Sequence, residues 1–118
     1  MNKVVLVGRL ASDSKVLTTN SGVKYTRNAI AVKRDFKGKD GGYDTDFLDF
    51  VAFDLEAEFL EKYCHKGDIV SLVARLQNNT YKDTKKLEIM GEKINLVSVA
   101  QPKEETPKVE EIEPELPF

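Results

Sequence analysis

Short runs of aliphatic and β-branched residues, each stopped by polar or turn-forming residues, constrain this 118-residue chain most strongly. Residues 4–10, 23–33, 69–77 and 87–99 are runs of this kind, and they predict strands. In residues 45–53, Leu48 and Phe50 point to one face, while Phe47 and Phe53 point to the other. This segment is therefore either a strand buried on both sides or a strand with one exposed aromatic face. We favour the exposed face, because Asp49 shares it and an unpaired buried carboxylate is costly.

Residues 55–65 instead have helical spacing, with an apolar stripe of Phe59, Leu60, Tyr63 and Cys64. Gly67 follows where a helix commonly ends. The predicted order is three strands, one helix and two strands, which is the order of the five-stranded Greek-key barrel called the OB-fold. The sequence thus predicts an all-β barrel with one short helix between strands 3 and 4, and residues 78–86 as the tip of a hairpin.

Charge divides the chain into two parts. The whole chain carries 18 basic and 20 acidic residues, a net charge of −2. Residues 101–118 hold two lysines and six glutamates, or −4, so residues 1–100 carry +2. We therefore expect one folded domain over residues 1–100, followed by a disordered acidic tail over residues 101–118.

Several functional classes find no support in the sequence. One cysteine excludes an internal disulfide, and with a single histidine it argues against a zinc site. Asp44 and Asp46 share a strand face that Asp49 does not, which weakens a hard-metal site. Cys64 and His65 are sequence neighbours and cannot face each other as a catalytic pair. We expect no catalytic residue, metal or cofactor. No membrane span or signal peptide is predicted, which indicates a cytoplasmic protein.

Aromatic residues interleaved with basic ones are the remaining signal. Bases of single-stranded nucleic acid stack on such rings with about 1–3 kcal/mol per base, whatever the sequence, while cations follow the phosphates. The candidate stacking residues are Phe36, Phe47, Phe53 and Tyr81. The candidate phosphate contacts are Lys33, Arg34, Lys37, Lys39, Lys82, Lys85 and Lys86.

The chain resembles the bacterial and phage single-stranded DNA-binding proteins, a family of homotetramers with one OB-fold per subunit. The resemblance begins with Asn2-Lys3-Val4-Val5-Leu6-Val7-Gly8-Arg9-Leu10 and continues through Asp46-Phe47, Phe59-Leu60 and Arg75-Leu76 in family order. It implies base stacking by the same four aromatic residues and assembly into a homotetramer or dimer.

The C-terminus extends the resemblance. Family members end in an acidic run, a hydrophobic residue, proline and phenylalanine, and that tip docks onto replication, recombination and repair proteins. The matching partner-docking residues here are Glu113, Glu115, Leu116, Pro117 and Phe118. Such a protein coats and protects single-stranded DNA and recruits partners.

The chain also departs from the family pattern. Ser14 follows Asp13 where proline is usual, and Asn28 stands where an apolar core residue is normal. Asn79 and Thr80 precede Tyr81 where many members have basic residues, and tryptophan is absent. Two other functions stay open: a protein-interaction module on an OB-fold that binds DNA weakly, and a small hydrolase on the same barrel.

Overall fold

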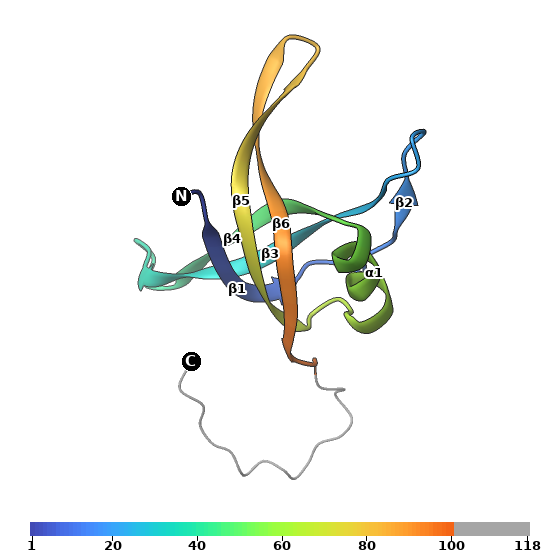
Figure 1. The fold of residues 1–118 in the computed structure, drawn as a ribbon. Helices are drawn as coiled ribbons and strands as arrows, with labels where there is room; N and C mark the ends of the chain where they lie inside the picture. Colours follow the sequence, from blue (N-terminus) through green and yellow to red (C-terminus); the bar gives the residue numbers. More distant parts are fainter. Residues whose placement is uncertain (101–118) are drawn as a thin grey trace.

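The computed structural model describes residues 1–100. Six strands and one helix are formed (Figure 1), and their bounds are β1 (Val4–Leu10), β2 (Leu17–Thr18), β3 (Lys24–Lys37), β4 (Tyr43–Phe53), α1 (Asp54–Tyr63), β5 (Ile69–Tyr81) and β6 (Thr84–Ser98). The predicted tail and its docking residues lie outside the described residues. No helix within the described part is long and apolar enough to cross a membrane.

Five of the strands close into a barrel. They are hydrogen-bonded in the order β1-β5-β6-β4-β3, and β1 pairs again with β3 to complete the ring. The β4–β6 pairing is parallel, and the others are antiparallel. The two-residue β2 only adds to the edge of β3. The predicted OB-fold is therefore confirmed. When β2 is left out of the count, α1 lies between the third and fourth strands as predicted.

The barrel core is built from the inward face of every long strand. Leu10, Ile30, Phe50, Leu72 and Ile94 are almost completely buried and pack together. Leu60 of α1 and Cys64, which follows the helix directly, add to this cluster, and Ala57 of α1 is buried as well.

Tyr63, a member of the predicted apolar stripe, is exposed rather than packed in the core, which corrects that prediction. Tyr63, the last residue of α1, lies outside the core and contacts the ring of Phe59, with the ring centroids 5.5 Å apart. Val97 is exposed because its neighbour Leu96 faces the core, and successive strand residues point to opposite faces.

The two faces of β4 differ along its length. Phe50 and Ala52 are buried in the core, as predicted. On the other face Val51 is only 2% exposed, whereas Phe47 is 65% exposed. The strand is thus buried on both sides around Val51 and has an open aromatic face toward its N-terminal end.

Asn28 and Ser14, two of the departures from the family pattern, contact each other. The Asn28 side-chain amide donates to Ser14 Oγ at 2.7 Å and to the Ser12 carbonyl at 2.9 Å. Its Oδ1 accepts from Ser12 Oγ at 3.1 Å. A buried amide is tolerated only when its polar atoms are paired, and these contacts provide that pairing.

Gly8 lies where β1 turns from β5 toward β3. It pairs with Val70 of β5, while the next residue, Arg9, pairs with both Ile69 and Ala31. A Cβ atom added at Gly8 would lie 2.2 Å from the backbone oxygen of Ala31. Closure of the barrel therefore requires glycine at this position.

We predict that Gly8→Ala destabilises the fold by about 1–3 kcal/mol or more, because a methyl group would push β3 away from β1. Thermal or urea unfolding followed by circular dichroism measures this effect. Gly42→Ala is the matched control, since a Cβ atom there would come no closer than 3.7 Å to its nearest neighbour. Equal stability of the two variants would contradict the role assigned to Gly8.

Candidate nucleic-acid interface

The long hairpin of β5 and β6 projects beyond the barrel (Figure 1). Its strands stay paired up to Tyr81 and Thr84, and Lys82 and Asp83 form a two-residue turn. Both turn residues have positive φ, 48° and 68°, as the tight turn that suits the twist of a hairpin requires. The predicted hairpin tip is thus a fully paired ribbon that carries Tyr81 at its end.

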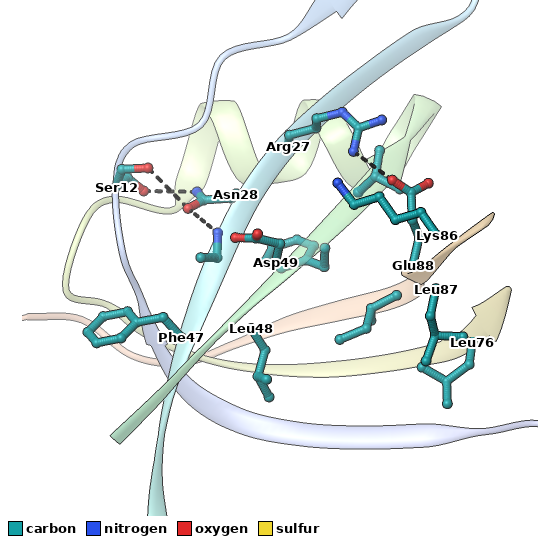
Figure 2. Close-up of a pocket in the computed structure, with 14 residues that line it drawn as sticks. Ser12, Arg27, Asn28, Phe47, Leu48, Asp49, Leu76, Lys86, Leu87 and Glu88 are labelled. Atoms are coloured by element: carbon teal, nitrogen blue, oxygen red, sulfur yellow. Dashed lines mark hydrogen bonds and ion pairs between the residues drawn. The ribbon is translucent and has the colours of Figure 1, made fainter. Parts of the chain in front are cut away.

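A groove of roughly 680 Å³ lies between this hairpin and the β3–β4 ribbon. Figure 2 shows Arg27 of β3 together with Phe47 and Asp49 of β4 on one side, and Leu87 and Glu88 of β6 on the other. Both apolar and charged side chains therefore line the groove, and two different ribbons supply them.

The exposed face of β4 continues beyond Phe47 to Tyr43, which was not among the predicted site residues. Tyr43, Phe47 and Asp49 lie at odd positions of one strand and so share a face. Lys33 of β3 places its ammonium 5.8 Å from the centroid of the Tyr43 ring. Extending the alternation of residues 45–53 by one further pair would have identified Tyr43 from the sequence.

The four predicted stacking residues are spread over the surface. Phe47 lines the groove, and Tyr81 lies next to it on the hairpin, where it contacts Glu88. Phe53 is half-buried at the far end of β4, about 20 Å from Phe47 along the strand. Phe36 is 67% exposed near the β3–β4 turn. The structure thus places one of the four rings in the groove, one beside it on the hairpin and one toward each end of the ribbon.

The predicted cations fall into two groups. Lys37 and Lys39 line a hollow beside Phe36, and Lys33 reaches Tyr43 on the same ribbon. The hairpin group consists of Lys82 in the turn, with Lys85 and Lys86 on β6, and Lys86 also lines the groove. All six lysines are exposed.

Arg34, the seventh predicted cation, is already engaged. Its guanidinium donates two hydrogen bonds to the Asp46 carboxylate, at 3.0 and 2.9 Å, and Asp44 lies 3.7 Å away. The hydrogen bonds from Arg34 lower the pKa of Asp46. A DNA phosphate would have to compete with this bidentate ion pair, a geometry that carboxylates and phosphates share.

Glu88 is the most buried charged group at the groove and was not predicted. It is 9% exposed, and it accepts hydrogen bonds from Asn79 at 2.6 Å, Tyr81 at 3.0 Å and Arg27 at 3.3 Å. The Asn79 hydrogen bond, followed by those from Tyr81 and Arg27, lowers the pKa of Glu88, although burial opposes this shift. The feature that could have identified Glu88 is its position in the hairpin, where it lies opposite the polar residues of β5.

The chemistry of this surface is stacking and ion pairing. Cys64 is 1% exposed, and burial raises the pKa of its thiol, which makes it a poor nucleophile. Within residues 1–100, no three acidic, cysteine or histidine side chains gather to hold a metal ion. The exposed rings and lysines instead form a surface suited to bases and phosphates.

Comparison with curated proteins finds bacterial relatives. The chain is 36% identical over 83 residues to "Single-stranded DNA-binding protein 1" of Staphylococcus aureus (strain MSSA476), covering 70% of this chain and 53% of that protein. It is 35% identical over 83 residues to the protein of the same name from Streptococcus pyogenes serotype M18, covering 70% and 64%. The chain thus spans about half the length of the S. aureus relative.

Solved structures share the fold. The single-stranded DNA-binding protein of Thermus aquaticus, a deletion mutant, superimposes with a TM-score of 0.69 at 18% identity, covering 83% of this chain and 51% of that one. The mitochondrial protein Rim1 of S. cerevisiae gives 0.66 at 23% identity, covering 83% and 97%. Residues 1–99 match the family model described as "Single-strand binding protein family". This chain therefore belongs to the single-strand binding protein family.

Proposed function

We propose that this protein binds single-stranded DNA without sequence preference, coating and protecting the strand in the cytoplasm. The observation that carries the proposal is the groove, which has the exposed ring of Phe47 on one wall and the hairpin bearing Tyr81 and Lys86 opposite. Family membership supports the same function. The binding is non-catalytic, since stacking and ion pairing alone account for it.

In this mechanism the bases stack on exposed aromatic side chains, and the phosphates follow the cations. The proposed stacking residues are the predicted Phe36, Phe47, Phe53 and Tyr81, with Tyr43 added. Lys86 of the hairpin lines the groove, and Lys37 and Lys39 line a separate hollow near the β3–β4 turn, so cations are available both in the groove and beyond it. Stacking needs only the face of a base, which makes the binding tolerant of sequence.

We further propose that the protein assembles into a homotetramer or dimer. Val5 and Val7 of β1 are 67% and 50% exposed, which leaves apolar surface on the outside of the barrel. Contact with a second copy would remove this surface from water.

We predict that Phe47→Ala and Tyr81→Ala each weaken binding to oligo-dT about 5- to 150-fold, from about 1–3 kcal/mol per stacked base. Fluorescence or gel titration at fixed salt measures the affinity. Tyr63→Ala, which removes an exposed aromatic residue of α1 away from the groove, should bind like the wild type. A preference for duplex, or no binding at low salt, would refute the function and favour a protein-interaction module. Unchanged affinity in both variants would place the site elsewhere.

We predict that Asp46→Asn strengthens oligo-dT binding and steepens its salt dependence. The substitution releases Arg34 for a phosphate, and each added phosphate contact contributes to the salt slope. Asp44→Asn is the matched control, because Asp44 lies farther from the guanidinium and makes no bidentate contact, so its effect should be smaller. Weaker binding by Asp46→Asn would contradict this prediction, because it would mean that the Arg34–Asp46 ion pair holds the site in its binding geometry rather than keeping Arg34 from the phosphate.

The acidic tail is proposed as the second binding site, for replication, recombination and repair proteins. The docking residues are Glu113, Glu115, Leu116, Pro117 and Phe118. Phe118 can fill an apolar pocket on a partner while its carboxylate and the nearby glutamates meet basic residues.

We predict that deleting residues 115–118 leaves oligo-dT affinity unchanged and abolishes capture of such partners in a pull-down. Phe118→Ala alone should reproduce most of the loss, because it removes the apolar anchor and keeps the acidic run. Undiminished capture by the deletion variant would rule out the tip as the docking site.

A further inference from the structure

A row of polar side chains runs along one face of the β5–β6 hairpin. Arg75, Gln77, Asn79 and Tyr81 alternate on β5 and therefore share a face. Arg75 donates to Gln77 at 2.9 Å, and Gln77 donates to Asn79 at 2.8 Å. Asn79 then donates to Glu88 of β6 at 2.6 Å. These hydrogen bonds connect the side chains continuously from the base of the hairpin toward its tip.

Glu88 ends the row and joins it to the barrel. Its Oε1 accepts from Asn79 and from the Tyr81 hydroxyl, while Oε2 accepts from Arg27 of β3, the contact drawn in Figure 2. β3 and β6 are not neighbours in the sheet. The Glu88–Arg27 ion pair therefore bridges the groove from the hairpin to the opposite ribbon.

We propose that Glu88 is a positioning residue of the single-stranded DNA site, holding the Tyr81 ring and the hairpin in the geometry that accepts a base. The inference rests on the proposed function. A hairpin ordered in advance loses less conformational entropy on binding. Asn79, which stands where many members of the family have a basic residue, thus contributes order to the hairpin through its hydrogen bond to Glu88.

The proposal and simple charge repulsion predict opposite changes in DNA affinity when Glu88 is removed. A carboxylate in a groove that receives DNA repels phosphates, so removing its charge alone should strengthen binding. If Glu88 positions Tyr81, removing it should weaken binding instead. Asp49 lines the same groove, its side chain is exposed, and among residues 1–100 it takes part in no ion pair. It therefore serves as the matched carboxylate without a positioning role.

The test is a double-mutant cycle on the full chain, read by titration with oligo-dT. Tyr81→Phe keeps the ring and removes only the hydroxyl, and we expect it to bind about two- to tenfold more weakly. Glu88→Ala should bind about tenfold more weakly. In the Glu88→Ala background, Tyr81→Phe should have no further effect, because its hydrogen-bond partner is already gone.

Asp49→Ala controls for charge and should bind more tightly than the wild type, because it removes a groove carboxylate that repels phosphates, with circular dichroism confirming that every variant folds. Tighter binding by Glu88→Ala, matching Asp49→Ala, would overturn the positioning role and leave the proposed function standing. Wild-type affinity of Tyr81→Phe would also overturn it, even if Glu88→Ala does not fold. Failure of the wild-type chain to bind oligo-dT would refute the proposed function itself.

Discussion

The close approach of β1 to β3 at Gly8 is the contact on which the rest of the structure depends. A Cβ atom at this position would lie 2.2 Å from the Ala31 backbone oxygen, so β1 can pair with both β5 and β3 only because the side chain is missing. This double pairing closes the sheet and leaves no free barrel edge. In the same barrel the parallel pairing of β4 with β6 sets the β5–β6 hairpin beside the β3–β4 ribbon, with the groove between them.

Departures from the family pattern occur in compensating groups. Asn28 and Ser14 each look unfavourable alone, since one puts an amide in the core and the other removes a proline from a turn. In the structure they form one hydrogen-bonded unit, with Asn28 donating to Ser14 at 2.7 Å. Asn79, another departure from the pattern that the resemblance implies, donates to Glu88. Residue types that conflict with a local pattern are thus paired with each other across the fold.

The charged side chains of the proposed binding surface are paired or clustered locally, while the net charge of residues 1–100 is small. Arg34 is bound by Asp46, and Arg27 by Glu88, so both guanidinium groups already have carboxylate partners. The lysines of the hairpin and of the β3–β4 turn are exposed and surround exposed rings. Residues 1–100, with a net charge of only +2, can therefore bind a polyanion when base stacking supplies much of the binding free energy.

The sequence by itself determined the fold class, the position of the helix and the exposed Phe36, Phe47 and Tyr81, because alternation and turn residues are local signals. Its composition also predicts a separate acidic tail over residues 101–118, which lies outside the described residues. Only the tertiary structure decided that Val51 is buried and that Glu88 links Arg27 to Tyr81. Such contacts join residues as far as 61 positions apart. Their partners are chosen by strand register and barrel closure, which no local pattern encodes.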